Sequence, residues 1–570
     1  MNVTGGPSLE ELAPGVPELI ARWRGWRQAE EGWEEGSAEK RSQAEMLIEY
    51  AEDAEVFHTP DETAYATFRV DDHEETWPVE SRRFELFLRQ RFFEDYEKAP
   101  KAQALKDALA TIVARAIFNG PEQQVFLRVA GHEGAIYVNL CNERWEAVEV
   151  TLAGWRVVTD PPVRFVRTKN SAPLPRPVGG GSMEDLRPFV RARGTDFELV
   201  VAWLVGAFRP TGPYPLLEIT GEQGTAKSTA ARVLRSLVDP AQVSLRALPT
   251  NERDLAIAAS ANWVLAFDNL SYVRPQVSDA MCRLSTGGGF GTRALYTDDE
   301  EALFDAMRAQ IVNGINRVVL RGDLQERSIE VTLLPIPKDE RRAEREFWAE
   351  FETARPKIFG ALLDAVSAAL RNVEEVRLEE LPRMADFAVW VTASEEALGW
   401  EQGAFMAAYC GNQRAATEAA LEADPVAVAL TKMLELQAKN EWRGTSEELL
   451  EDLGKEVSDD VRHSKAWPKA PNALSRRLNR LAPLLREVGI EYEEREEGRE
   501  KKKIKVLRKI DDGGSEGTSQ DDTPPDERPA SDGGDAPRSF FKTYEGVDDG
   551  APFNFNFGED EEAEGGSSYD

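Results

Sequence analysis

The sequence predicts an α/β fold built around a parallel sheet, with smaller domains on either side. A short strand at residues 213–220 runs into a glycine-rich loop and a helix, and further apolar strands follow at residues 263–268 and 309–313. Strands that alternate with helices along the chain form parallel sheets. One core is not enough for 570 residues, because about three or four domains are expected at this length.

The composition indicates a globular protein of the cytoplasm. With 41% hydrophobic residues the chain can bury cores, which excludes global disorder. The three cysteines, Cys141, Cys282 and Cys410, and the four histidines are scattered singly, so neither a disulfide framework nor a zinc site is predicted. No apolar run reaches the roughly 18 residues that span a bilayer, and the N-terminus lacks the features of a signal peptide. We therefore expect a cytoplasmic protein without membrane contact.

The net charge of −33 is spread unevenly along the chain. Residues 511–570 contain 18 acidic and three basic residues, so nearly half of the negative excess lies in this segment. The segment is also rich in Gly, Ser and Pro, and it predicts a disordered acidic tail. Local basic stretches therefore matter more than the total charge for any contact with a polyanion.

The N-terminal part predicts an α+β accessory domain at residues 37–170, after a flexible arm at residues 1–36. Amphipathic helices are followed there by segments of alternating polarity. The expected helices cover residues 38–55, 84–98 and 103–118, and the expected strands cover residues 64–70, 124–130, 135–140, 147–152 and 155–158. A stretch rich in Pro, Gly and Ser at residues 171–182 predicts a hinge-like linker.

The rest of the chain divides into three further predicted domains. The α/β core covers residues 183–336 and begins with a buried helix at residues 196–208. Long helical patterns then predict a helical lid at residues 337–424. Residues 425–510 show three helices and two strands around Gly498, which is the order of a winged helix-turn-helix.

The strongest local signal is the loop between the first core strand and the following helix. Its residues are Gly221, Glu222, Gln223, Gly224, Thr225, Ala226, Lys227, Ser228 and Thr229. Such a loop presents backbone N–H groups and a helix N-terminus to phosphate oxygens, while Lys227 reaches the β- and γ-phosphates and Ser228 supplies a Mg²⁺ ligand. We therefore predict ATP and Mg²⁺ as cofactors. The alternative is a chance match in an ordinary strand-to-helix turn.

Ala226 stands where glycine usually precedes the lysine of such a loop. Alanine can begin a helix without strain, so we expect the loop to keep its shape.

Asp268 is the candidate acid for the metal. It ends the apolar strand at residues 264–268, about forty residues after the loop, where a carboxylate would hold Mg²⁺ through water. Asn269 follows it, and an amide can orient a water molecule but cannot take its proton. Either another acid does this or hydrolysis is slow. The alternative for Asp268 is a strand-end residue that caps a turn.

Three further segments resemble superfamily 3 helicases of the poxvirus primase-helicase type. Residues 284–296, LSTGGGFGTRALY, resemble the segment after the metal-binding acid in that family. Residues 310–313, QIVN, resemble its sensor strand, and residues 323–328, DLQERS, resemble its arginine-finger segment. The resemblance spans about residues 185–335, and ATP-binding proteins of phages and integrating mobile elements share this arrangement.

The resemblance implies an AAA+-like core that assembles into a homo-oligomeric ring, usually a hexamer. It implies that Asn313 positions the attacking water and that Arg327 reaches the nucleotide of a neighbouring subunit. Considered alone, Asn313 also fits a turn cap and Arg327 a surface salt bridge. The expected catalytic residues are Lys227, Asp268, Asn269, Asn313 and Arg327.

In that family a hairpin before the sensor strand lines the ring's pore and offers a basic residue to single-stranded DNA. The candidate tip here, residues 297–301, contains four carboxylates, which repel phosphate. Arg293 is then the candidate DNA contact. The acidic turn either serves the subunit interface or is a solvated loop.

A second candidate DNA surface lies in the predicted winged helix. Leu474, Leu478 and Leu481 form a core stripe on one helix, which leaves arginines on its more exposed faces, and lysines follow the turn at Gly498. The candidate contacts are Arg476, Arg477, Arg480, Lys501, Lys502, Lys503 and Lys505. The alternative is a protein-contacting module, since four glutamates stand on the facing strand.

The tail combines acidic residues with Phe553, Phe555 and Phe557. It is a candidate docking segment for a replication protein, or a competitor of DNA for the chain's own basic surfaces. The alternative is a tail that only improves solubility.

These observations together predict a helicase-like replication ATPase of a phage or mobile element, acting as a ring on single-stranded, forked or origin DNA. No zinc cluster or convincing pair of carboxylates in the first 170 residues supports primase chemistry. One alternative is an ATP-switched replication initiator or helicase loader without strong unwinding, which Asn269 and the acidic hairpin favour. Another is a DNA-sensing defence ATPase, which the same motifs permit.

Overall fold

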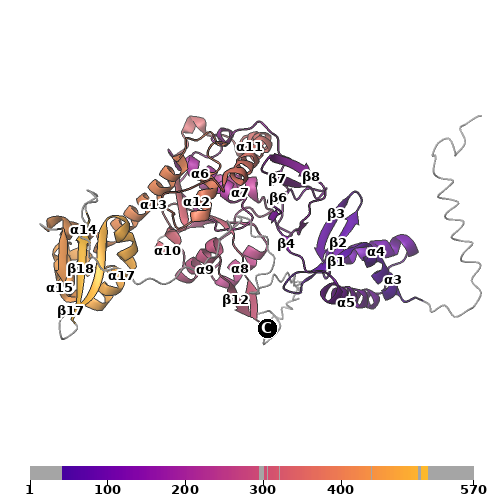
Figure 1. The fold of residues 1–570 in the computed structure, drawn as a ribbon, viewed down its shortest axis with the longest axis horizontal. Coiled ribbons are helices and arrows are strands. Elements are labelled where there is room, and N and C mark those ends of the chain that lie inside the picture. Colours follow the sequence, from indigo (N-terminus) through magenta and orange to yellow (C-terminus); the bar gives the residue numbers. More distant parts are fainter. Residues whose placement is uncertain are drawn as a thin grey trace, which may run out of the picture. The chain divides into compact units, whose positions relative to one another are not determined.

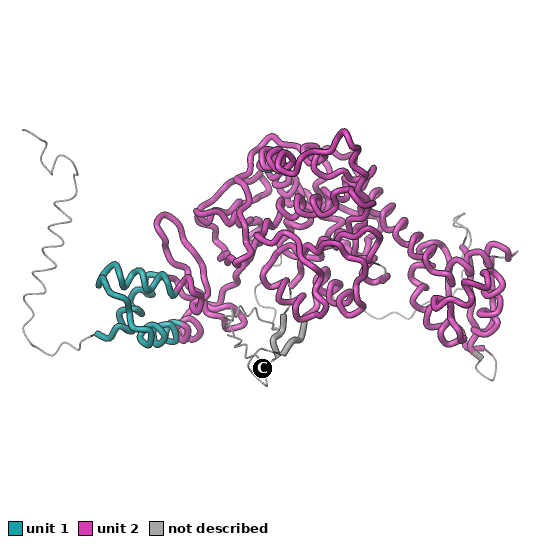
Figure 2. Tube along the Cα trace, turned by 180° about the vertical axis from the view of Figure 1, so that it is seen from behind, with its two compact units in different colours: residues 1–53, 85–112 teal, residues 54–84, 113–570 magenta. Residues whose placement is uncertain are grey.

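The computed structural model describes residues 41–293, 301–304, 306–319, 321–437, 440–497 and 502–510 (Figure 1). The predicted arm at residues 1–36 and the predicted tail at residues 511–570 lie outside these ranges. The chain divides into two compact units, one of residues 1–53 with 85–112 and one of residues 54–84 with 113–570 (Figure 2). The predicted accessory domain is therefore not a single unit. None of the described helices is long and apolar enough to cross a membrane.

The described part of the first unit is helical. It contains α3 (Gln43–Tyr50), η1 (Ala51–Asp53) and most of α4 (Arg82–Tyr96) and α5 (Ala102–Asn119). Helix α3 begins at Ser42 with a capping box, in which Ser42 and Glu45 each satisfy a backbone N–H of the other. The hydroxyl of Tyr50 donates to Asp95 of α4 at 2.6 Å and so links two of the helices.

The second unit begins with small antiparallel sheets. The first has the order β1-β2-β3. The second has the order β5-β6-β7-β8, and a short parallel pair joins β4 to β9. Their bounds are β1 (Glu55–His58), β2 (Ala64–Val70), β3 (His73–Pro78), β4 (Val125–Phe126), β5 (Val129–His132), β6 (Ala135–Asn139), β7 (Ala147–Thr151), β8 (Gly154–Val158) and β9 (Arg164–Phe165).

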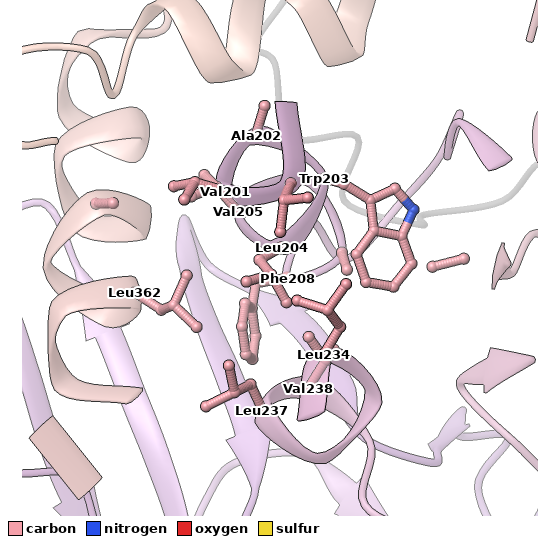
Figure 3. Close-up of a cluster of buried hydrophobic side chains, with 14 of the residues drawn as sticks. Val201, Ala202, Trp203, Leu204, Val205, Phe208, Leu234, Leu237, Val238 and Leu362 are labelled. Atoms are coloured by element: carbon pink, nitrogen blue, oxygen red, sulfur yellow. The ribbon is translucent and has the colours of Figure 1, made fainter. Parts of the chain in front are cut away.

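The β5–β8 sheet shares its hydrophobic core with the central α/β region. Buried side chains of this sheet, such as Ile136 and Val150, belong to one cluster with those of α6 (Asp196–Gly206), α7 (Lys227–Val238) and α11 (Glu344–Asn372). Figure 3 shows where α6, α7 and α11 meet in that cluster. Because one core joins these segments, the sheet does not form a separate accessory domain.

Residues 171–182, predicted as a hinge, are packed against other parts of the chain. The N–H of Leu174 donates to Leu140 at 2.9 Å, and the N–H of Val178 donates to Pro356 at 2.9 Å. Gly360 of α11 lies so close to the backbone of this segment that a Cβ added to it would be 2.1 Å from the carbonyl oxygen of Val178. Close backbone contacts of this kind hold the segment in place, which the high Pro and Gly content did not reveal.

The central sheet has the strand order β11-β14-β10-β15, and all of its pairs are parallel. The strands are β10 (Leu216–Thr220), β11 (Val264–Leu270), β14 (Ala309–Gly314) and β15 (Ser328–Thr332). Alternate residues face two different cores, one with α6, α7 and α11, and one with α8 (Glu252–Ser260) and α9 (Pro275–Thr286). This mixed α/β architecture explains why the strands are apolar on both faces.

Short elements surround this sheet. A 3-10 turn, η2 (Met183–Leu186), precedes α6, and an antiparallel hairpin of β12 (Phe290–Arg293) and β13 (Glu301–Phe304) precedes β14. A single turn, α10 (Gly322–Gln325), leads into β15.

The region predicted as a helical lid begins with η3 (Lys338–Glu340) and α11, followed by α12 (Ala385–Thr392) and α13 (Ala404–Glu422). Buried residues of α11, α12 and α13 belong to the same cluster as α6 and the central sheet. These helices therefore complete the main core instead of lying over it as a separate layer.

The C-terminal region has a core of its own. It contains α14 (Pro425–Leu436), β16 (Glu441–Gly444), α15 (Ser446–Lys455), α16 (Asp459–His463), α17 (Pro471–Glu487), β17 (Ile490–Glu497) and β18 (Lys502–Lys509). The strand order is β16-β18-β17, with β18 paired to both neighbours. The sequence predicted three helices followed by two strands here, and the structure adds the short helix α16 and β16, a four-residue strand whose one buried side chain, Trp442, gives no periodic signal.

Candidate nucleotide site

The glycine-rich loop lies at the carboxyl end of β10, a strand in the middle of the sheet. Helix α7 begins at Lys227, directly after the loop. Its first N–H groups have no partners within the helix and point toward the loop, as phosphate binding requires. Gly221 and Gly224 have φ values of 143° and 90°, which residues with a side chain rarely adopt.

Ala226 does not begin the helix without strain, contrary to the prediction. It has φ 59° and ψ 35°, the left-handed conformation, and α7 begins only at the next residue. This conformation costs a residue with a Cβ about 1 kcal/mol. The glycine usual at this position avoids that cost, and the rest of the loop supports the strain here.

Lys227 is held inside the loop. Its ammonium donates to the carbonyl oxygens of Gly221 at 2.7 Å and Glu222 at 2.8 Å. Partial burial lowers its pKa, and the charge of Asp268 opposes this shift. The ammonium is thus already positioned over the loop, where it can exchange carbonyl oxygens for phosphate oxygens.

Ser228 and Asp268, forty positions apart, meet at the predicted metal position. The Ser228 hydroxyl donates to Asp268 Oδ1 at 2.7 Å. Asp268 is half-buried near the end of β11, and Ser228 lies in the first turn of α7. A hydroxyl and a carboxylate are hard oxygen ligands of the kind that Mg²⁺ prefers, with its remaining positions filled by water and phosphate. The donor set therefore fits Mg²⁺ bound together with a nucleotide.

Asn313 comes to the same place from the strand between β10 and β11. Its Oδ1 accepts the N–H of Asn269 at 2.9 Å, and its side chain is only 1% exposed. Its Nδ2 has no hydrogen-bond partner among the described residues. A buried amide donor without a partner is costly, so this Nδ2 is a candidate ligand-binding donor.

Asn269 has the left-handed φ of 57°, and its side chain is exposed. Asn adopts this conformation more readily than most residues. The hydrogen bond from the Asn269 N–H to Asn313 and the conformation of Asn269 together fix the backbone just after Asp268.

Arg327 lies near the amino ends of the strands, whereas the loop lies at their carboxyl ends. It precedes β15, whose first residue pairs with the first residue of β10, whereas the loop follows the last residue of β10. Its side chain is largely buried and pairs with Asp323 of the same chain. Arg327 therefore does not reach the nucleotide site of its own chain, and in this structure it is not presented on the surface.

Glu218 was not among the predicted site residues. This residue in the middle of β10 is 1% exposed and accepts the N–H groups of Val318 at 2.5 Å and Val319 at 3.1 Å. Burial raises its pKa to about 7. It holds the segment that follows Asn313, and a single acid inside the apolar strand LLEIT was its sequence signal.

The candidate DNA contacts on α17 differ in what they offer. Arg476 and Arg480 are exposed. Arg477 instead forms an ion pair with Asp424, the N-cap of α14, at 2.8 Å. Arg477 therefore holds two helices of this domain together, and its charge is already compensated.

The lysines after the turn are also largely compensated. Lys505, 1% exposed, donates to Glu494 and to the Tyr492 hydroxyl, each at 2.8 Å. Its burial differs from the expected exposed position, because its face of β18 packs inward. Lys503 is exposed and pairs with Glu494 at 3.1 Å. Lys502 stands opposite Glu497 in the register, and Lys501 lies outside the described residues.

The predicted pore hairpin corresponds to β12 and β13, in which Arg293 is the register partner of Glu301. The rest of its acidic tip, residues 297–300, lies outside the described residues, and so do Phe553, Phe555 and Phe557.

Comparison with family models gives two adjacent matches. Residues 185–411 match the actinomycete integrative conjugative element replication protein family. Residues 426–520 match the C-terminal domain of the same replication protein. Together the two matches cover more than half of the chain.

The chain belongs to this family. It is thus a replication protein of an integrative conjugative element, which confirms the prediction of a mobile-element replication protein at this level. A comparison with curated proteins found no match.

Two solved structures align over most of this family member. The SCCmec type IV Cch active helicase aligns with 80% of this chain and 93% of its own, at 11% identity and a TM-score of 0.43. The apo NrS-1 C-terminal region aligns with 83% of this chain and 100% of its own, at 12% identity and a TM-score of 0.37.

Proposed function

We propose that this replication protein is a helicase-like ATPase that binds Mg·ATP between the subunits of a ring and acts on DNA. The observation that carries the proposal is the meeting of Ser228, Asp268 and Asn313 beside the glycine-rich loop. They come from α7, β11 and β14. The Ser228 hydroxyl donates to Asp268 at 2.7 Å, and the N–H of Asn269, the residue after Asp268, donates to Asn313 at 2.9 Å. An ordinary strand-to-helix turn does not require this convergence.

The residues have separate roles in the proposed reaction. Loop N–H groups and Lys227 bind the phosphates, and Ser228 and Asp268 hold the metal. The metal, when bound, neutralises charge on the phosphate oxygens. The free Nδ2 of Asn313 lies beside this position and orients the attacking water. Asn269 holds the local backbone and takes no proton.

The position of Arg327 supports a site shared between subunits. Because five residues of β15 and β10 separate it from the loop, it lies about 16 Å from its own phosphate site. An arginine in this position can contact the nucleotide of a neighbouring subunit but not that of its own chain. Its pairing with Asp323 must then be exchanged on assembly, and Arg383, 3.8 Å from the same carboxylate, is placed to take over.

DNA binding is assigned to the winged helix, through the exposed Arg476 and Arg480 on α17. The N-terminal part of such a helix enters the major groove in related architectures. Arg293 on the hairpin remains the proposed contact of the pore with single-stranded DNA.

A second candidate, an ATP-switched initiator or helicase loader, is favoured by the chemistry after Asp268. Asn269 cannot accept a proton, and Asp268 accepts the Ser228 hydroxyl and is assigned to the metal. Slow hydrolysis suits a switch, in which ATP binding changes assembly. A defence ATPase has no such support, and membership in a replication-protein family opposes it.

The deciding experiment measures ATP hydrolysis by the full-length protein with and without single-stranded DNA, with Lys227→Ala as the blank. Stimulation by DNA that disappears in the blank supports the motor, and strand-displacement assays then establish unwinding. Slow hydrolysis that is indifferent to DNA, with ATP-dependent assembly retained, supports the switch. No ATP binding by the wild-type protein overturns both.

A further inference from the structure

A cavity of about 630 Å³ lies at the far end of α7 from the phosphate-binding loop. Its walls include Arg232, Arg235 and Ser236 of α7, the segment from Pro240 to Leu245, and part of α11. Arg232 and Ser236 follow Lys227 by five and nine positions, which is about 7.5 Å and 13 Å along the helix axis, and no residue of the loop lines the cavity. The cavity is therefore distinct from the proposed ATP site.

The cavity has an excess of positive charge. Three of its lining residues are arginines, Arg232, Arg235 and Arg355, and Glu352 is the one lining carboxylate. Glu352 pairs with Arg355 at 3.1 Å. The donors of Arg235 are already used, because it donates to the carbonyl oxygens of Asp239, Val243 and Ser244 and to Asn262. Arg232 is the lining guanidinium whose carboxylate partner, Glu344, lies outside the lining.

Two of the lining arginines are buried, and both lie near a further buried arginine, Arg128, which repels them. Arg235 and Arg355 are 1% and 8% exposed. Burial lowers the pKa of both, and the charge of the buried Arg128 adds to this shift. Arg128 itself pairs with Asp239 at 2.9 Å, and Asp239 also accepts the N–H groups of Trp263 and Val264. The three buried arginines, Arg128, Arg235 and Arg355, thus share two carboxylates, Asp239 and Glu352, which leaves an excess of one positive charge among them.

Arg355 also has an unused donor. Its terminal nitrogens bond Glu352 and the Ser236 carbonyl, the latter at 2.7 Å, but its buried Nε has no hydrogen-bond partner among the described residues. Arg232 is 42% exposed in its side chain, and its nearest carboxylate, Glu344, is 3.7 Å away. An anion in the cavity would accept a hydrogen bond from the Nε of Arg355 and form an ion pair with Arg232.

The opposite wall adds a flat apolar surface. Trp348 of α11 lines the cavity, and its ring is fixed edge-to-face against Phe347 and Phe351. An immobilised indole is a stacking platform for a nucleobase. Gln242 and Ser244 supply further polar groups on the wall between α7 and α11.

We propose that this cavity is a second nucleotide-binding site, in which Arg232 and the Nε of Arg355 bind phosphate and Trp348 stacks on the base. The nucleotide is either free or part of a DNA strand, since both offer the same phosphate and base chemistry. The inference goes beyond the proposed function and does not depend on hydrolysis at the loop.

The test measures nucleotide binding to full-length Lys227→Ala protein, whose loop site is impaired. Fluorescent ATP is expected to bind this variant, and the wild-type protein is expected to bind two nucleotides per subunit. Two further substitutions are each added to this variant: Arg232→Ala, and Gln242→Glu, which places a negative charge on the wall at nearly constant shape. Each is expected to weaken binding about tenfold, which corresponds to the loss of one charge-assisted hydrogen bond. Arg345→Ala, an exposed arginine of α11 outside the cavity, is the matched control and leaves the affinity unchanged.

Competitors identify the source of the ligand and the role of the indole. Displacement of the probe by ATP alone identifies a free nucleotide, and displacement by a short oligo(dT) identifies a DNA strand. Trp348→Leu should weaken ATP binding more than pyrophosphate binding, because pyrophosphate has no base. The proposal is overturned if Lys227→Ala binds no probe, or if Arg232→Ala and Gln242→Glu both leave its affinity unchanged.

Discussion

At the scale of single residues, the nucleotide site depends on side chains and backbone positions that are costly elsewhere in a fold. Ala226 is in a left-handed conformation, Asn313 has a buried donor without a described partner, and Glu218 is a carboxylate inside a central strand. Such features cluster at functional sites, because the surrounding structure must offset their cost. Ala226 and Glu218 each predict a measurable change in stability.

Ala226→Gly is expected to stabilise the protein. Glycine removes the left-handed strain of about 1 kcal/mol but makes the unfolded chain more flexible, so the net gain is about 0.5 kcal/mol. Ala230→Gly, in the interior of α7, is the control and should destabilise by about 1 kcal/mol or more. Thermal unfolding of both variants checks the signs. A loss of stability in Ala226→Gly contradicts the strained loop.

Glu218 predicts a pH-dependent stability. Burial raises its pKa from 4.5 to about 7, so the folded state binds a proton more tightly than the unfolded state does. Its contribution is full below about pH 4.5 and is lost as the pH rises to about 7. Glu218→Gln keeps an acceptor oxygen for Val318 and Val319 without the charge. The variant should therefore exceed the wild type at pH 8 by up to about 3 kcal/mol, with the gap closing toward pH 5. A gap that does not change with pH refutes this assignment.

At the scale of elements, some charges of α17 and of the strands behind it are paired within the domain, and others are exposed. Arg477 and Lys505 are committed to Asp424 and Glu494, whereas Arg476 and Arg480 are exposed. The charge of an element therefore overstates what it offers to a phosphate backbone. Within this domain, positions on the exposed face of α17 are expected to contribute most to DNA affinity.

Arg480→Ala is expected to weaken DNA binding and to reduce the slope of log affinity against log salt by about one, as the loss of a phosphate contact does. Arg477→Ala, on the same helix, should leave that slope nearly unchanged and lower the stability of the winged helix, since it exposes the buried side of Asp424. Fluorescence anisotropy at several salt concentrations and thermal unfolding separate the two effects. Equal losses of DNA affinity contradict the division of roles.

At the scale of the whole molecule, the proposed activity depends on assembly. The loop, Asp268 and Asn313 lie together in one chain, whereas Arg327 lies near the opposite ends of the strands and is paired with Asp323. Under the proposed function, Arg327 therefore completes the site of a neighbouring subunit and not its own.

Mixing two inactive variants tests this arrangement. Lys227→Ala subunits retain Arg327, and Arg327→Ala subunits retain the loop, so mixed rings contain complete sites. In an equal mixture roughly one interface in four is complete, and about a quarter of the wild-type hydrolysis should return. Each variant alone is the control. No recovery, with mixed assembly verified by cross-linking, refutes the shared site.

The sequence by itself determined the parts that depend on local chemistry. Glycines, a lysine and a serine at fixed spacing fix a phosphate loop, and apolar strands alternating with helices fix a parallel sheet. It also indicated Asp268 and Asn313 as the ends of two such strands. The family match agrees with the predicted mobile-element replication protein.

Only the tertiary structure decided which segments share a core and which charges are free. Residues 171–182 have the composition of a linker, yet they pack against α11, because a backbone contact at Gly360 leaves no trace in local composition. The same holds for Lys505 and Arg327, whose burial depends on partners brought together by folding. Local pattern specifies secondary structure and motif, whereas burial and ion pairing arise from contacts between residues far apart in the chain.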